Sequence, residues 1–233
     1  MNATLNEIST RLAPLGLITR GVVRSTDGQA IARSETSQRS PVELFTLILV
    51  GNAGSAIWGP FTASAEYGDG RADPMDRWSE RIAWELAEDF DAVPLFPFGG
   101  PPHHPFLTWA RQAEGLHPSP LGLLIHPQFG LWHAYRFALG FRSVLELSEA
   151  VGEAPSPCLA CAEQPCLSAC PVDAFTGEDY RVDVCADHLI GEGDSVCSGQ
   201  GCRSRLACPV GAEFCYQPDH AAFHMAAFTE SRR

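Results

Sequence analysis

The sequence predicts an α+β protein in two parts, a mixed α and β domain over residues 1–150 and a cysteine-rich domain over residues 151–233. Three observations lead to this prediction. Helix and strand patterns follow one another along the first part, and all nine cysteines lie at residue 158 or later. Between the two parts, residues 151–157 read Val-Gly-Glu-Ala-Pro-Ser-Pro, a composition typical of a linker.

The first elements are a helix and a strand. Residues 3–13 predict a short helix that ends before Pro14, which cannot continue it. Residues 42–51, Val-Glu-Leu-Phe-Thr-Leu-Ile-Leu-Val-Gly, form a mainly apolar run that indicates a buried strand. We expect a helix to follow from about Ala53.

A longer helix begins at Asp73-Pro74, because aspartate favours the N-cap and proline the first helical position. Four apolar side chains then share one stripe, as a surface helix requires: Trp78, Ile82, Leu86 and Phe90. Residues 92–98 predict a strand that ends at Gly99-Gly100, and residues 105–114 predict a further helix. Two more strands, over residues 121–125 and 131–141, are joined by a turn at residues 126–130.

The cysteine-rich part contains two similar phrases, Ala-Cys170-Pro171 and Ala-Cys208-Pro209. A cysteine followed by proline at the end of a run of spaced cysteines is typical of bacterial iron–sulfur proteins. The spacing is Cys-x2-Cys-x4-Cys-x3-Cys-Pro in the first run and Cys-x4-Cys-x5-Cys-Pro in the second, with one cysteine between them. The eight candidate ligands of two 4Fe-4S clusters are Cys158, Cys161, Cys166, Cys170, Cys185, Cys197, Cys202 and Cys208.

The ligands of the two clusters are expected to cross over. In two-cluster ferredoxins the cysteine before proline binds the other cluster. The first cluster would then have the ligands Cys158, Cys161, Cys166 and Cys208. The second would have the ligands Cys170, Cys185, Cys197 and Cys202. Crossing ligands would hold the clusters within electron-transfer distance, so the pattern predicts a protein that moves electrons.

Three other interpretations of the cysteines stay open. A structural zinc site also uses Cys-x2-Cys, but it needs four ligands and has no use for paired Cys-Pro steps. A disulfide framework needs an oxidising compartment, and the irregular second run leaves a single cluster with spare cysteines as the third alternative. Cys215 is left over and is expected to be a buried or incidental thiol.

The turn at residues 126–130 concentrates residue types that suit a binding site. It brings a histidine, a proline, a glycine and several aromatic side chains to the end of a strand, where binding residues are often found. Two interpretations remain at this point. The turn binds a large, flat ligand, or His126 only caps the turn while Trp132 belongs to the core.

The segment around this turn resembles a known family. Its phrase Ile-His126-Pro-x-Phe-Gly-x-Trp132 is similar to the signature loop of cobalamin-processing proteins of the CblC type, and Asp73-Pro74-x-Asp76 resembles a helix start of that family. The loop is more distantly similar to epoxyqueuosine reductase and to reductive dehalogenases, which carry a two-cluster ferredoxin module. The cysteine order of epoxyqueuosine reductase, four, one and three ending in Cys-Pro, resembles the order in this chain.

The resemblance implies a nitroreductase-like domain that binds cobalamin in the base-off form, with iron–sulfur clusters nearby. The residues it places against the corrin are His126, Pro127, Phe129, Gly130 and Trp132. The Asp-x-His-x-x-Gly pattern by which another cobalamin fold ligates cobalt is absent, so His126 would touch the corrin rather than the metal. Flavin mononucleotide is the alternative occupant, because nitroreductase-like folds commonly bind it. The Gly-Trp-x-Gly-Lys-Asn phrase of epoxyqueuosine reductase and any counterpart of its catalytic acid are missing, and no catalytic residue is assigned.

These expectations combine into one functional hypothesis: a cytoplasmic corrinoid iron–sulfur protein. It would reduce a bound corrinoid, with or without removal of the upper axial ligand, using electrons from an unidentified donor. The alternatives are a ferredoxin-type carrier without corrin and a cobalamin-dependent reductase of a small molecule. The net charge of −12 argues against nucleic acid as a partner. Residues 1–15 show no signal-peptide pattern, and the longest apolar stretch, residues 44–50, is too short for a membrane span.

Overall fold

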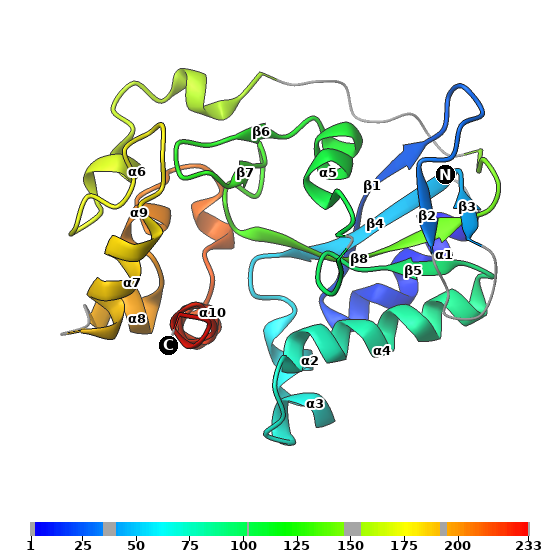
Figure 1. Ribbon diagram of the computed structural model, residues 1–233, viewed down its shortest axis with the longest axis horizontal. Helices are drawn as coiled ribbons and strands as arrows, with labels where there is room; N and C mark the ends of the chain where they lie inside the picture. Colours follow the sequence, from blue (N-terminus) through cyan, green and yellow to red (C-terminus); the bar gives the residue numbers. More distant parts are fainter. Residues whose placement is uncertain (1–2, 35–40, 102, 147–154, 192–194, 233) are drawn as a thin grey trace. The chain divides into compact units, whose positions relative to one another are not determined.

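The computed structural model describes residues 3–34, 41–101, 103–146, 155–191 and 195–232, and the chain divides into two compact units. Unit 1 comprises Met1–Gly115 and Ala134–Glu153, and unit 2 comprises Leu116–His133 and Ala154–Arg233. The fold is mixed α and β, as expected (Figure 1). The units differ from the predicted division at residue 150 because Leu116–His133 packs with the cysteine-rich segment. Residues 151–154 of the predicted linker lie outside the described residues.

A four-stranded sheet forms the centre of unit 1. Its order is β1 (Ile18–Arg24), β4 (Thr46–Ala53), β8 (His133–Phe141) and β5 (Val93–Leu95). β1 pairs antiparallel with β4, and β5 pairs antiparallel with β8. All but the last residue of β4 are buried, as expected for an apolar strand in the middle of a sheet that is covered on both faces.

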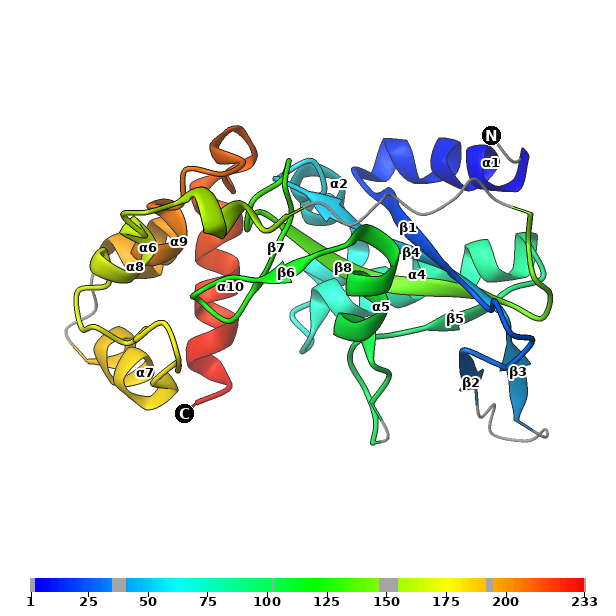
Figure 2. The same ribbon diagram turned by 90° about the horizontal axis from the view of Figure 1, so that it is seen from above.

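Helices cover the two faces of this sheet. Figures 1 and 2 show α5 (Phe106–Glu114) on one face, and α1 (Ala3–Leu12) and α4 (Pro74–Asp89) on the other. Phe106, Trp109 and Ala113 of α5 join strand residues such as Leu47 and Leu49 in one buried cluster. Odd-numbered side chains of β4 therefore pack under α5, because neighbouring strand residues point to opposite faces.

The predicted strand over residues 42–51 is two strands in the structure. β3 (Val42–Leu44) pairs with β2 (Ala32–Ser34), and β4 starts at Thr46 after a break in which the Phe45 amide donates to the Phe141 carbonyl. A helix follows this strand, as expected, but it starts later than Ala53 because β4 continues to that residue. The next helices are α2 (Trp58–Thr62) and α3 (Ala65–Gly68), and a short 3-10 turn, η1 (Ala13–Leu15), follows α1.

The helix predicted at Asp73-Pro74 is confirmed as α4, but its expected side-chain cap is absent. Asp73 has a left-handed backbone, with φ of 51°, and its carboxylate makes no capping hydrogen bond. The buried stripe is as predicted as far as Leu86, while Phe90 lies just past the helix and is half-buried. On the exposed side, Arg77 pairs with Asp69 at 2.7 Å and Arg81 with Glu66 at 2.6 Å.

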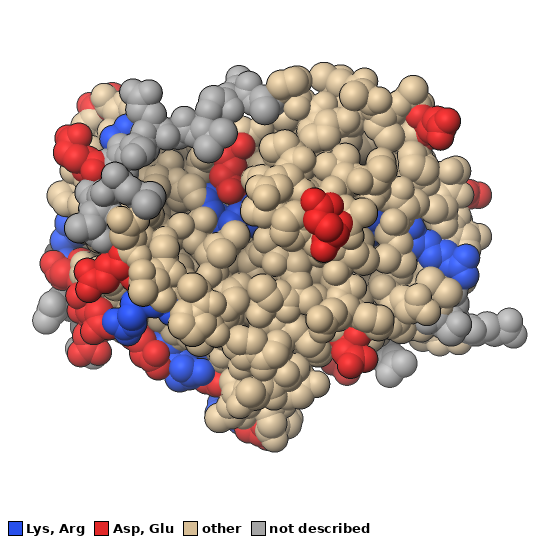
Figure 3. Space-filling view, turned by 180° about the vertical axis from the view of Figure 1, so that it is seen from behind, with Lys and Arg blue, Asp and Glu red and all other residues tan. Residues whose placement is uncertain are grey.

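The face shown in Figure 3 carries acidic and basic side chains next to one another, with no broad basic patch. Within the described ranges, no helix combines the length and apolar character needed to cross a bilayer.

The strands and helix expected between residues 92 and 141 are confirmed in part. β5, α5 and β8 lie where the sequence predicts them. The strand expected over residues 121–125 is only β7 (Leu124–Ile125), which pairs with β6 (His117–Pro118) and not with the sheet that contains β8. The turn itself is closed by a bridge between His126 and Gly130.

Unit 2 contains short helices between the cysteines. They are η2 (Pro157–Ala160), α6 (Pro165–Ser168), α7 (Val182–Ile190), α8 (Ser195–Gln200), α9 (Arg203–Leu206), η3 (Ala212–Phe214) and α10 (Pro218–Glu230). α6 packs against α9, and α10 packs against α7 and α8 (Figure 2).

The two Ala-Cys-Pro phrases have the same local structure. α6 ends just before Ala169-Cys170 and α9 just before Ala207-Cys208. The backbone angles are close to identical, with φ −82° and ψ −10° at Ala169, and φ −74° and ψ −11° at Ala207. Each of these alanine amides donates to the carbonyl of the first residue of its helix. The repeat seen in the sequence is therefore a repeat in the structure.

Candidate metal centre

Four cysteines of unit 2 line one small hollow. Its other walls are mainly apolar and come from two stretches of chain, the loop at residues 119–131 and the cysteine segments. Leu121, Ile125 and Leu131 belong to the same buried cluster as two of the thiols. The thiols that line the hollow, here called the first thiol group, are Cys158, Cys161, Cys166 and Cys208. They are the four ligands predicted for the first cluster, including the crossing ligand.

These thiols lie close enough to influence one another electrostatically. Burial raises the pKa of Cys166, and the neighbouring Cys208, Cys158 and Cys161 raise it further. The pKa of Cys158 is also raised, chiefly by burial, with smaller contributions from Cys208 and Cys161. Several thiolates in an apolar hollow repel each other, so the ionised group needs a cation to stabilise it. A bound metal centre would supply that charge and keep the thiols deprotonated.

A second thiol group contains Cys170, Cys185 and Cys202. Burial raises the pKa of Cys185, and Cys202 and Cys170 act in the same direction, whereas a hydrogen bond with Tyr180 lowers it. The amide of Ala174 donates to the Cys170 sulfur at 3.2 Å. These three cysteines are among the four predicted for the second cluster.

The two remaining cysteines differ in their surroundings. Cys197 is buried in α8, and its place as fourth ligand of the second group stays a prediction. Cys215 is half-buried and packs beside Trp132 and Tyr216, with its sulfur 3.7 Å from the Tyr216 carbonyl. Burial raises the pKa of Cys215, while the nearby Arg205 lowers it. Neither thiol group includes it, as expected for a leftover thiol.

The arrangement of the cysteines bears on two of the other interpretations, a disulfide framework and a structural zinc site. All nine cysteines lie in described residues and none forms a disulfide. Within the described ranges, no three or more His, Cys, Asp or Glu side chains are placed to share a single metal ion. A tetrahedral zinc site would bring its sulfurs to about 3.8 Å from each other. A 4Fe-4S cluster binds each thiolate at a different iron, so its ligands stand farther apart than the ligands of one zinc ion.

The predicted binding loop is joined closely to the second Cys-Pro phrase. Gly130 has φ of 57°, and a Cβ atom there would lie 1.8 Å from the Val210 carbonyl oxygen. Gly211 has φ of 67°, and its Cβ would lie 2.4 Å from the Phe129 carbonyl carbon. Only glycine allows two backbones to approach this closely, and only glycine adopts these angles readily. The loop is therefore part of the framework around the first thiol group.

His126 organises its own turn. Its Nδ1 accepts hydrogen bonds from the amides of Gln128 at 3.0 Å and Phe129 at 3.1 Å, and its ring stacks on Phe129 with centroids 4.3 Å apart. This is the capping role that the sequence left open. His126 and Phe129 are half-buried and Pro127 is exposed, so this edge of the loop faces solvent in part.

Trp132 is a core residue, as the second interpretation of the sequence expects. It is 2% exposed, and the guanidinium of Arg205 lies 4.3 Å from its ring centroid and 4.6 Å from that of Tyr216. Arg205 also donates two hydrogen bonds to the Leu131 carbonyl, at 3.1 and 2.5 Å. Gly130 and Trp132 thus have packing partners within unit 2, and a contact of His126, Pro127 and Phe129 with a ligand stays a prediction.

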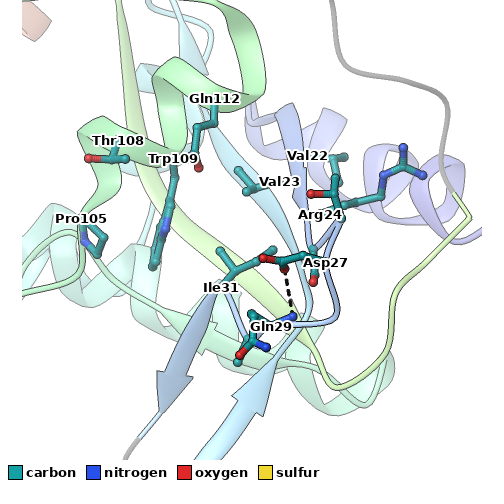
Figure 4. A pocket seen from close by; sticks show the side chains of 13 residues that line it. Val22, Val23, Arg24, Asp27, Gln29, Ile31, Pro105, Thr108, Trp109 and Gln112 are labelled. Atoms are coloured by element: carbon teal, nitrogen blue, oxygen red, sulfur yellow. Dashed lines mark hydrogen bonds between the residues drawn. The ribbon is translucent and has the colours of Figure 1, made fainter.

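Unit 1 has a separate open cavity of about 620 Å³ between β1, the turn that follows it and α5. Figure 4 shows Trp109 and Gln112 reaching from α5 toward Asp27 and Gln29, while the side chain of Arg24 runs away from this space. The charge that faces the cavity is therefore the Asp27 carboxylate. The flavin mononucleotide alternative stays a prediction.

Sequence reasoning missed Ser156, Tyr180, Arg205 and Tyr216 at the site. Ser156 and Arg205 stand within three residues of a predicted ligand, and that proximity was the available signal. Comparison of the chain with models of protein families and with curated proteins finds no match to either. The motifs and the geometry therefore carry the functional argument.

Proposed function

We propose that this protein is an iron–sulfur electron-transfer protein with two 4Fe-4S clusters in unit 2. The first cluster would be held by Cys158, Cys161, Cys166 and Cys208, and the second by Cys170, Cys185, Cys197 and Cys202. The observation that carries the proposal is the hollow lined by the first four thiols, since it joins three cysteines of one run to the last cysteine of the other. A bound 4Fe-4S cluster supplies one electron at a time at low potential.

The residues around the first thiol group support the proposal that it binds a cluster. The apolar walls formed by Leu121, Ile125 and Leu131 exclude water from the first group. Water exclusion strengthens the interaction of the thiolates with a cationic centre and protects it from hydrolysis. The same backbone geometry precedes Cys170 and Cys208, as expected for two related cluster sites.

A corrinoid is the electron acceptor that we propose. The resemblance of the loop to CblC-type proteins suggests it, and one structural observation favours it. The loop that carries His126, Pro127 and Phe129 also contributes Ile125 and Leu131 to the hollow around the first thiol group. A corrinoid at the exposed edge of this loop would lie near the source of electrons and would be reduced one electron at a time.

An electron carrier without corrin is the second candidate. It is favoured by the hydrogen bonds that use His126 Nδ1 within its own turn and by the burial of Trp132. Both observations give these residues a role that needs no ligand.

The cluster proposal is tested by counting iron after anaerobic reconstitution. We expect about eight irons per chain, as two cubanes require. Cys208→Ala should lose about four of them, whereas the matched variant Cys215→Ala should keep all of them. Equal iron contents in the two variants would contradict the crossing ligand.

The corrinoid proposal is tested on the same reconstituted protein by titration with hydroxocobalamin, followed by visible absorbance. Stoichiometric binding with a base-off spectrum supports it, and His126→Ala should weaken the binding. Full iron content with no corrin binding would leave the second candidate, an electron carrier without corrin. Corrin affinity that is unchanged in His126→Ala would place the corrin elsewhere.

A further inference from the structure

Two histidines of α10 face each other across one turn of the helix. His220 and His224 are four residues apart, a spacing that places two side chains on the same face of a helix. Their Nε2 atoms are 3.1 Å apart. Neither residue belongs to a thiol group, and the proposed electron transfer uses neither of them, so the pair needs an explanation of its own.

The ring of His220 is held in a fixed position. The residue is 0% exposed, and its ring stacks on Tyr216 with centroids 4.0 Å apart and an interplanar angle of 17°. Tyr216 is in turn tilted against Trp132, with centroids 5.4 Å apart, and the guanidinium of Arg205 lies over its ring. The Nε2 atom of His220 is therefore oriented before a ligand binds, which lowers the entropy cost of binding.

His224 forms the more accessible half of the pair. It is half-buried, and its ring is inclined at 43° to that of His220, with centroids 5.0 Å apart. Phe223 meets the His224 ring edge-on, with centroids 5.6 Å apart. A ligand that bridges the two Nε2 atoms would therefore enter from the side of His224.

The distance between the two Nε2 atoms suits a shared metal ion. Imidazole nitrogen binds Zn²⁺ at about 2.0–2.1 Å, so two nitrogen ligands of a tetrahedral ion are about 3.3–3.4 Å apart. At the same bond length, neighbouring ligands of an octahedral ion are about 2.8–3.0 Å apart. The observed 3.1 Å lies between these values, so either geometry needs only a small movement of His224.

The protons of the pair are compatible with metal binding. One Nε2 donates its hydrogen to the other. A metal ion would take the place of this hydrogen, and the donor ring would carry its proton on Nδ1 instead, so no proton has to leave the neutral pair. Below a pH of about 6.5 histidine becomes charged, and protons compete with the metal for the two nitrogens. Binding should therefore weaken as the pH falls.

We propose that His220 and His224 bind one divalent transition-metal ion, of the Zn²⁺ or Ni²⁺ type, at a site that uses none of the thiols. Neutral imidazole suits these ions, whereas Mg²⁺ and Ca²⁺ prefer oxygen ligands. Within the described ranges no third His, Cys, Asp or Glu side chain joins the pair, so water or an added ligand would complete the coordination. This inference does not depend on the proposed clusters.

The test is equilibrium dialysis of the anaerobically reconstituted protein against micromolar Ni²⁺, with nickel and iron counted in the same sample. We expect His224→Gln to bind one nickel ion per chain fewer than the unaltered protein, with equal iron in both. Glutamine keeps a hydrogen-bond partner for His220, so the buried ring stays in place. His103→Gln is the matched control, because it removes an exposed histidine of unit 1 and should keep the nickel.

Two results would overturn the inference. One is an equal nickel content in the unaltered protein and in His224→Gln, whether that content is zero or more. The other is an equal loss of nickel in His224→Gln and His103→Gln, which would show binding to surface histidines in general. All three proteins have the same nine cysteines, so the nickel difference does not depend on cluster formation. Absence of iron with the nickel difference preserved would refute the proposed function alone.

Discussion

At the scale of single residues, the contact between Gly130 and Val210 is the tightest constraint on unit 2. The loop and the segment after Cys208 meet backbone to backbone, with glycines on both sides of the contact. A side chain at Gly130 would have to push these segments apart, and the wall formed by Ile125 and Leu131 would move with the loop. The position of the wall thus depends on a residue that itself has no side chain.

We expect Gly130→Ala to destabilise unit 2 much more than Gly122→Ala. Both glycines have positive φ and lie in the same loop, but nothing lies within 4 Å of a Cβ at Gly122. The unfavourable backbone angle alone should lower the free energy of unfolding by about 1 kcal/mol in Gly122→Ala. The added overlap with Val210 should raise this loss to about 3 kcal/mol in Gly130→Ala. Urea unfolding of the two variants measures the difference, and equal losses would contradict the close approach.

The grouping of the cysteines was accessible from the sequence, whereas their hydrogen-bond partners were not. Cysteine spacing and the Cys-Pro step are local signals, and they predict the first thiol group that the structure brings together. The amide of Ala174, which donates to the Cys170 sulfur at 3.2 Å, carries no such signal. Its contact with the sulfur depends on how the chain turns after Cys170, which only the folded chain shows.

At the scale of elements, prediction succeeded where periodicity was strong and failed where polar residues interrupt it. α4 and α5 repeat their apolar residues at helical spacing and were located within one residue. β1 was missed because its sequence, Ile-Thr-Arg-Gly-Val-Val-Arg, contains two arginines and a glycine. Arg20 is nevertheless fully buried, since it pairs with Glu114 at 2.9 Å and lies over the ring of Tyr135.

Strand pairing is a second element-scale feature, one that the sequence leaves open. Residues 124–125 and 133–141 follow one another along the chain, and the sequence predicts two strands joined by a turn without indicating their partners. In the structure they belong to different sheets, because β7 pairs with β6. β6 is two residues long, and its Pro118 has no amide hydrogen to donate to a partner strand. Pairing over two residues leaves almost no sequence pattern from which it could be inferred.

The two tryptophans of α4 offer a test of how this element packs. Trp78 is 1% exposed and lies on the buried stripe, whereas Trp84 is 55% exposed on the same helix. We expect Trp78→Ala to lower the free energy of unfolding by about 3–5 kcal/mol through cavity formation. Trp84→Ala should change it by less than about 0.5 kcal/mol. Thermal or urea unfolding of each variant provides the measurement, and similar losses would show that α4 is packed differently.

At the scale of the whole molecule, the two units differ in what stabilises them. Unit 1 has a sheet with large buried side chains on both faces. Unit 2 has short helices, and two of the five residues in the buried cluster around its hollow are cysteines. A second small cluster in this unit contains Trp132 and Tyr216. A unit whose buried residues form small clusters of this kind commonly depends on bound metal for its stability.

Removal of the proposed clusters from the reconstituted protein should therefore unfold unit 2 and leave unit 1 largely intact. Hydrogen–deuterium exchange before and after anaerobic treatment with an oxidant and a chelator would show this. We expect amides in α6, α7 and α9 to lose their protection, while amides in β4 keep theirs. Equal protection of both units after iron removal would mean that unit 2 is stabilised by its apolar contacts alone.

The division of each unit between two stretches of chain affects how the protein is made. During translation unit 1 stays incomplete until β8 has been synthesised, and by then the loop of unit 2 has emerged without the cysteine segments that it packs against. The buried cluster of Leu121, Ile125 and Leu131 is complete only when the ribosome has passed the second Cys-Pro phrase, because Cys208 and Val210 belong to it. A gene fragment that begins at residue 151 would encode every thiol but omit this wall, so cutting there would separate parts that fold together.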